Sequence, residues 1–137
     1  MSSHLYSDAI KQLARAQREQ TPLTQIDVKT TLDNPLCGDR ITTHIKLKEG
    51  RISHIYQHVQ GCLLCNASAN ILTRLAIGRN QTQFEQGSRH LAEFLNSSSK
   101  YLPKPWQEFS MFEPARYHKN RHTCIELPLQ AILQSLE

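Results

Sequence analysis

The chain has 137 residues, a length that suits a single domain over residues 1–137, and its formal net charge is +4. Its basic residues are scattered apart from those in 116–121, so we expect no nucleic-acid partner. It shows no charged-then-apolar leader and no run near the roughly 20 apolar residues of a membrane span. We therefore expect a cytoplasmic protein with no membrane partner. Its four cysteines should stay reduced and act as ligands or reactive groups.

Hydrophobic periodicity in the first half predicts one helix followed by a small sheet. Apolar residues at helical spacing predict a helix over 5–18 that ends before Thr21. A short strand is expected around Ile26 and Val28. Alternating patterns predict two further strands over 41–47 and 52–59, joined by a hairpin. Strict alternation on the last strand would put Ile52 and His54 on the same face.

The second half reads as mostly helical. A helix is predicted from Cys62 to Ile77, stopped by Gly78, and another from an N-cap at Thr82 with Glu85 completing a capping box. The aromatic segment from Trp106 to Phe112 predicts a short helix that Glu113-Pro114 ends. The last helix is expected to begin near Leu127, with Pro128 in its first turn. Together these elements predict an α+β fold, in which helices cover one face of an antiparallel sheet of about three strands.

The most informative stretch is Asn34-Pro35-Leu36-Cys37-Gly38-Asp39, directly ahead of a strand. Gly38 allows a positive φ between the two polar side chains, so the turn can aim a thiolate and a carboxylate at one point. A soft sulfur beside a hard oxygen is typical of a metal site that is more than structural. The alternative is a turn with a buried cysteine and a capping aspartate.

Cys62 and Cys65 form a CxxC at the expected start of a helix, where unpaired N–H groups favour a thiolate. This pair is compatible with a redox motif, with a metal half-site, or with a functional Cys62 and a packing Cys65 one turn further on. Cys124 follows basic residues that would activate a thiol, although a buried apolar cysteine is common. His118 and His122 are either further ligands or solvated side chains.

Taken together, these residues resemble the SufU/IscU/NifU-type iron–sulfur cluster assembly family. The hexapeptide 34–39 matches its first motif, Gly61-Cys62 with Ala67-Ser68-Ala69 resembles its second, and Arg121-x-x-Cys124-x-x-Leu127 resembles its third. The long interval between Cys62 and Cys124, and Arg121 three residues before Cys124, are similar to the SufU branch. Val59, where the family usually has glycine, and Cys65, where it commonly has a small hydroxyl residue, depart from the pattern.

The resemblance implies a site and a function. Its metal ligands are Cys37, Asp39, Cys62 and Cys124, with Arg121 offsetting part of their charge. It implies a zinc ion, persulfide acceptance on Cys124 from a SufS-like cysteine desulfurase, and downstream iron–sulfur assembly or acceptor proteins. The activity would be that of a zinc-dependent sulfurtransferase. Two alternatives stay open. The first is an IscU-like scaffold that holds a [2Fe–2S] cluster, or iron, on the same residues and passes it on. The second is a small interaction domain in which zinc stabilises the fold.

Overall fold

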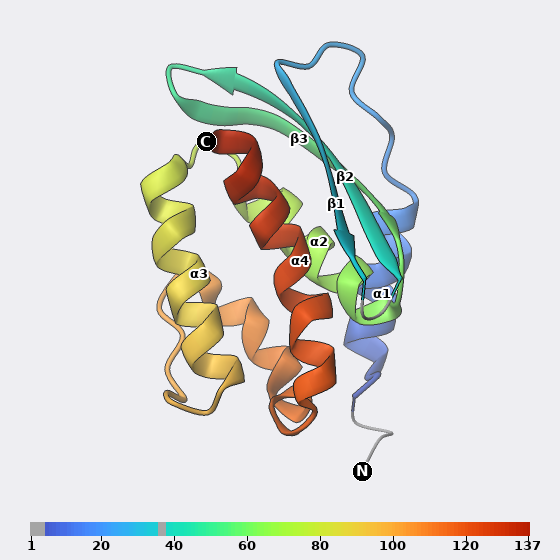
Figure 1. Ribbon diagram of the computed structural model, residues 1–137, viewed down its shortest axis with the longest axis vertical. Helices are drawn as coiled ribbons and strands as arrows, with labels where there is room; N and C mark the ends of the chain where they lie inside the picture. The colour runs from blue at the N-terminus through green and yellow to red at the C-terminus, as the bar shows by residue number, and fades with distance from the viewer. Residues whose placement is uncertain (1–4, 36–37) are drawn as a thin grey trace.

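The computed structural model describes residues 5–35 and 38–137. Three strands form an antiparallel sheet in the order β1-β2-β3, as the alternating patterns predict: β1 (Val28–Asn34), β2 (Asp39–Lys48) and β3 (Arg51–Gln60) (Figure 1). The pairing of Asn34 with Asp39 brings the two ends of the predicted turn together. Gly38 has a φ of 72° and donates its N–H to the Asn34 carbonyl oxygen over 2.8 Å, so the expected positive φ is confirmed.

A β-bulge interrupts the alternation expected on β3. The register between β2 and β3 shifts between Lys46 and Leu47, so that Leu47 pairs with Ile52 while Lys46 pairs with His54. One extra residue, Ser53, therefore lies between two paired positions, and the faces exchange there. Ile52 is buried in the core whereas His54 is exposed, so the prediction that they share a face is wrong.

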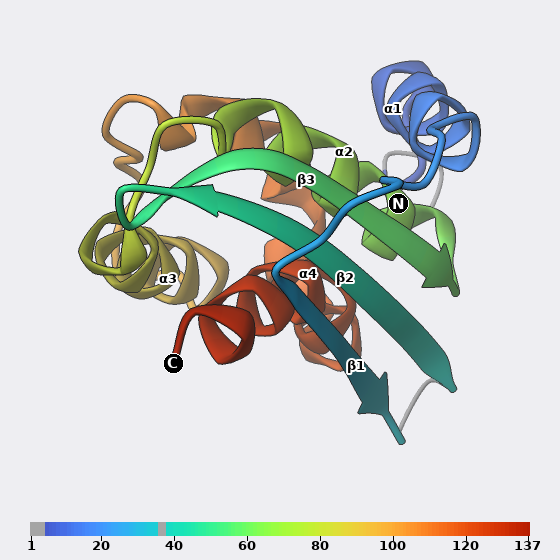
Figure 2. The same ribbon diagram turned by 90° about the horizontal axis from the view of Figure 1, so that it is seen from above.

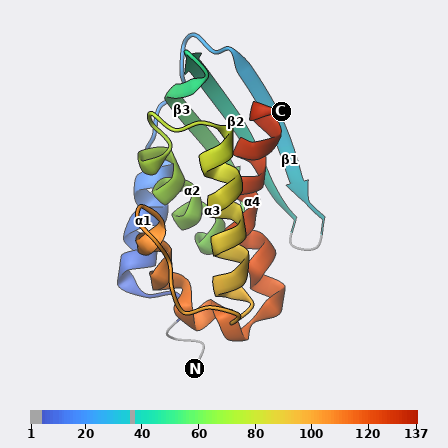
Figure 3. The ribbon, with the colours of Figure 1, turned by 90° about the vertical axis from the view of Figure 1, so that its left-hand side faces the viewer.

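The helices gather on one face of the sheet (Figures 2 and 3). Helices α2 (Leu63–Leu75) and α4 (Lys119–Leu136) lie against the strands, α2 on β3 and α4 on β1 and β2. Helix α1 (Asp8–Arg18) packs on α2, and α3 (Gln81–Leu95) packs on α4 and on the 3₁₀ helix η2 (Trp106–Tyr117). The core between them is apolar and includes the buried side chains of Ile41, Ile45, Leu64, Phe84, Phe109 and Ile125. None of the helices in the described part of the chain combines the length and apolar character needed to cross a membrane.

The start of α3 differs from the prediction. Its N-cap is Asn80, and the capping box pairs Asn80 with Gln83 rather than Thr82 with Glu85. The Asn80 side chain accepts the Gln83 N–H over 3.1 Å, and Gln83 Oε1 accepts the Asn80 N–H over 3.0 Å. Asparagine caps a helix at least as well as threonine, so the earlier cap is favoured.

Proline ends neither of the last two helices. η2 is a 3₁₀ helix that continues through Pro114, so the expected end at Glu113-Pro114 is wrong. Its buried apolar positions recur every three residues: Trp106, Phe109, Phe112 and Ala115. α4 begins at Lys119, so Cys124 lies inside the helix and Pro128 lies in its middle, not in its first turn. The expected start near Leu127 is therefore wrong, because the buried face of α4 already begins at His122 and Ile125.

Candidate metal centre

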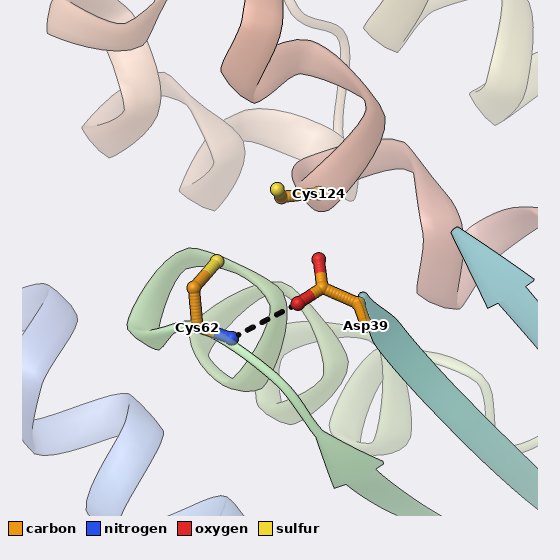
Figure 4. A group of neighbouring side chains, drawn as sticks. All are labelled: Asp39, Cys62 and Cys124. Atoms are coloured by element: carbon orange, nitrogen blue, oxygen red, sulfur yellow. Dashed lines mark hydrogen bonds between the residues drawn. The ribbon is translucent and has the colours of Figure 1, made fainter. Parts of the chain in front are cut away.

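Three side chains from three different elements meet at one end of the sheet (Figure 4). Asp39 is the first residue of β2, Cys62 is the N-cap of α2, and Cys124 projects from α4. One potential ligand atom from each of the three lies within 4.8 Å of the others. The sequence places these residues far apart, and the antiparallel pairing of the strands with the packing of α4 brings them together.

Asp39 is buried, with 3% of its surface exposed. Its Oδ1 accepts the backbone N–H of Cys62 over 3.2 Å, so the carboxylate also holds the N-terminus of α2 (Figure 4). Its Oδ2 is buried and has no hydrogen-bond partner among the described residues. A buried carboxylate oxygen without a donor is costly, and a cation in the site would satisfy it.

The Cys62 thiol is unusually acidic. Its pKa is lowered from 9.0 to about 6, first by a hydrogen bond with the Cys124 side chain, and further by the backbone N–H groups of Cys65 and Leu64. Burial and the nearby charge of Asp39 raise the pKa and offset part of this effect. The helix N-terminus therefore favours a thiolate at this position, as the sequence predicts.

Cys124 is fully buried and is held from both sides of its helix. The Asn34 side chain donates to Thr123 Oγ1 over 3.0 Å, which ties the end of β1 to α4. Ser68 of α2 donates to the carbonyl oxygen of Ile125 over 2.6 Å. Because Pro128 has no N–H, it cannot give the Cys124 carbonyl the usual bond within the helix. The hydrogen bonds of its neighbours Thr123 and Ile125 to β1 and α2 thus fix the position of Cys124.

The other residues singled out from the sequence lie elsewhere. Cys37 lies outside the described residues. Cys65 is buried in the core and does not join the described cluster. His122 is buried, with Nε2 3.1 Å from the Ala115 carbonyl oxygen and 3.2 Å from that of Arg116, so it serves the packing of η2 on α4. His118 is the half-buried residue between those two helices, and Arg121 lies one turn before Cys124, half-buried.

Three supporting residues were not assigned a role from the sequence. Asn34 ties β1 to α4, Ser68 ties α2 to α4, and Asn66 donates to the carbonyl oxygens of Gly61 and Cys62 over 3.3 and 3.2 Å. Two of them stand within the motifs quoted above, Asn34 in the first and Ser68 in the second. Their place in these motifs was the available signal, whereas Asn66 offered none, because the sequence does not show which polar side chains are buried.

The donor set suits a metal. Two cysteine sulfurs and one carboxylate oxygen are ligands that zinc accepts in tetrahedral sites, and thiolates also bind iron in iron–sulfur clusters. The acidic Cys62 and the unpartnered Asp39 Oδ2 both fit a cation at the centre of the three side chains. The arrangement therefore supports a metal-binding site that mixes thiolate and carboxylate ligands.

Comparison with known proteins agrees with this geometry. Residues 5–110 match the model of the family described as the NifU-like N terminal domain. The chain belongs to this NifU-like family. Among curated proteins, it is similar to the iron-sulfur cluster assembly scaffold protein IscU 1 of Archaeoglobus fulgidus, with 32% identity over 75 residues, 55% of this chain and 49% of that protein. The match thus spans about half the length of that relative.

Other relatives of this NifU-like chain extend the match over its full length. The iron-sulfur cluster assembly scaffold protein IscU of Streptococcus pyogenes serotype M1 is 22% identical over 135 residues, 98% of this chain and 84% of that protein. A NifU-like protein (N-terminal) from Brucella abortus superposes with a TM-score of 0.89 at 22% identity, covering 98% of this chain and 94% of that one. A putative scaffold protein for the SUF system from Fervidobacterium islandicum gives 0.87 at 18%, covering both chains completely. The two structures establish the shared α+β fold.

Proposed function

We propose that this chain acts in iron–sulfur cluster assembly, as a SufU-like protein that accepts persulfide sulfur from a cysteine desulfurase. The observation that carries the proposal is the convergence of Asp39, Cys62 and Cys124 within 4.8 Å, with one buried carboxylate oxygen left without a donor. The family membership and the printed names of its relatives as iron–sulfur cluster assembly scaffold proteins support the same process.

The proposed metal is zinc, held by Cys37, Asp39, Cys62 and Cys124. When bound, zinc keeps its cysteine ligands as thiolates at neutral pH. Three thiolates and one carboxylate carry four negative charges against two positive ones, and Arg121 is the cation on α4 that we assign to offset part of the difference. Asp39 is the hard, weak ligand of the set, so it favours a site that opens over one that stays closed.

The proposed reaction is a thiol–persulfide exchange at Cys124. The Cys124 thiolate attacks the outer sulfur of the desulfurase persulfide, a new S–S bond forms, and the desulfurase cysteine leaves as a thiolate. Electrons balance within the exchange, so no external oxidant or reductant is needed. Because Cys124 is fully buried in the described structure, acceptance requires the site to open. Downstream assembly or acceptor proteins would then receive the sulfur.

A second candidate is an IscU-like scaffold that assembles and passes on a [2Fe–2S] cluster. The observation that favours it is the printed description of the relatives as scaffold proteins. The same thiolates would hold the cluster, and Asp39 as the single oxygen ligand would make it labile. Protein purified without oxygen separates the two candidates. Colourless protein with one zinc per chain supports sulfur acceptance, whereas brown protein with iron and sulfide supports the scaffold.

Three variants test the sulfur-accepting role directly. Bound metal and persulfide acceptance from a cysteine desulfurase are measured in parallel for Cys124→Ser, Asp39→Ala and Cys65→Ser. We expect Cys124→Ser to abolish acceptance, and Asp39→Ala to retain metal while transfer slows. Cys65→Ser is the matched control, because Cys65 is equally buried yet lies outside the described cluster. Unchanged acceptance in both Cys124→Ser and Asp39→Ala would rule out this mechanism.

A further inference from the structure

A buried arginine lies away from the three-residue cluster, at the end of η2. Arg116 is 8% exposed, and its Nε is buried without a hydrogen-bond partner among the described residues. The ion pairs within the described ranges join Arg40 to Asp33 and Arg74 to Glu108, each over 2.7 Å, and none involves Arg116. A charged side chain is thus withdrawn from water without a carboxylate to balance it.

The contact that Arg116 does make is aromatic. Its guanidinium carbon lies 4.8 Å from the centre of the Phe94 ring, a cation–π contact that stabilises one face of the group. The Nε–H, which lies in the guanidinium plane, has no hydrogen-bond partner among the described residues. Buried charges in proteins are normally paired and hydrogen-bonded, whereas Arg116 has no carboxylate partner in the part of the chain that the structure describes. The in-plane fork of a guanidinium matches a planar carboxylate in two parallel hydrogen bonds.

Arg116 lines a hollow of about 470 Å³ that is open to the surface. The other lining residues come from α3, the loop after it and η2. They supply one more cation, one acid, two serine hydroxyls and two aromatic rings: Phe94, Ser97, Lys100, Ser110, Glu113 and Tyr117. The single acid among them, Glu113, is exposed, and its Oε1 accepts the Tyr117 hydroxyl over 3.4 Å. The hollow therefore holds two cations against one carboxylate, and that carboxylate is directed to a tyrosine.

We propose that this hollow, the Arg116 pocket, binds a carboxylate group. Arg116 would hold the carboxylate in its fork, with Lys100 adding charge and Ser97 and Ser110 adding hydroxyl donors at the rim. A guanidinium fork can also bind a phosphate in two hydrogen bonds, so inorganic phosphate is the competing ligand that the test includes. The same carboxylate can come from a small organic acid or from an acidic side chain of a partner protein.

The pocket is connected to the segment that carries Cys124. The His122 ring, two residues before Cys124, lies within hydrogen-bond distance of the backbone carbonyl oxygens of Ala115 and Arg116. A ligand that fixes Arg116 would therefore act on the first turns of α4. The inference about carboxylate binding itself stands on Arg116 and its surroundings, and does not depend on what the metal centre does.

Nuclear magnetic resonance of the full chain tests the pocket without relying on a variant. The Arg116 Nε–H resonance is followed in ¹⁵N-labelled protein during titration with succinate, with inorganic phosphate, and with the peptide acetyl-Gly-Glu-Gly-amide beside its Gln counterpart. We expect a saturable shift with succinate or with the Glu peptide, and none with the Gln peptide. A response to succinate alone assigns a small acid as the ligand, and a tighter response to the Glu peptide assigns a partner's acidic side chain.

Two variants complete the test. Arg116→Lys keeps the charge but loses the fork, so we expect it to lose the rise in melting temperature that the carboxylate probe gives the unmodified protein. Arg74→Lys is the matched control, because Arg74 already pairs with Glu108, and it should keep that rise. The proposal is overturned if the Arg116 resonance does not respond to any carboxylate probe, if phosphate shifts it as strongly, or if Arg116→Lys responds like the unmodified protein.

Discussion

Gly61 lies against the buried carboxylate of Asp39, and this contact makes a quantitative prediction. A Cβ built on Gly61 would overlap Asp39 Oδ1 and lie 2.8 Å from Cγ and 3.1 Å from Cβ of the same residue. Gly61→Ala must therefore push the Asp39 side chain away, which breaks its bond with the Cys62 N–H. Loss of one hydrogen bond to a charged group costs about 1–3 kcal/mol. We expect that decrease in the free energy of unfolding, measured with urea on metal-free protein.

A double-mutant cycle shows whether Asp39 is the cause. In an Asp39→Ala background the overlapping oxygen and Cγ are gone, and the remaining contact to Cβ at 3.1 Å needs a small shift. Gly61→Ala should then cost much less, and the difference between the two backgrounds is the coupling energy, about 1–2 kcal/mol. Equal costs in both backgrounds would refute the reasoning, and would assign the effect of the alanine to the backbone of the turn.

Three further predictions concern the cysteines and the helix packing. In metal-free protein, alkylation of Cys62 by iodoacetamide should rise with a midpoint near pH 6, and Cys124→Ala should move that midpoint upward, since the Cys124 hydrogen bond is the largest cause of the shift. Because the folded thiol is the more acidic one, the contribution of Cys62 to stability should be flat below pH 6 and increase from there toward pH 9. An alkylation midpoint close to pH 9 would contradict both expectations. Cys65→Ser should retain full metal content, whereas loss of metal equal to that of Cys62→Ser would make the CxxC a true half-site. Gly87→Ala would drive a Cβ into the Trp106 indole and should cost about 2 kcal/mol in urea unfolding, with the exposed Gln86→Ala as the control that stays near zero.

The sequence was sufficient for the elements whose pattern is local. The sheet follows from alternating residues, Gly38 takes the positive φ that its turn requires, and Cys62 begins α2 as its position after β3 predicts. The meeting of Asp39, Cys62 and Cys124 was expected through resemblance to a family. Spacing alone left a redox motif, a half-site and a packing cysteine open, because distances between elements are not encoded locally.

The errors arise where a local signal competes with packing. Pro128 is a strong marker for a first turn, yet α4 carries it in its middle, because the buried face of the helix continues on both sides of it. The bulge at Ser53 leaves no mark in the alternation, because Ile52 and Ile55 are both apolar and either register is compatible with the pattern. Long-range contacts decided both cases, and a single sequence does not show them.

The arrangement of charges in the cluster argues that a cation belongs there. Asp39 raises the pKa of Cys62, which means that the carboxylate and the thiolate repel each other. The fold nevertheless holds both groups near Cys124, and it uses Asp39 Oδ1 to bind the start of α2 while Oδ2 remains without a donor among the described residues. Hydrogen bonds from Asn34 and Ser68 fix α4 on the far side, so the groups cannot simply move apart. Repelling anions that this frame keeps within 4.8 Å of one another would be stabilised by a positive ion between them.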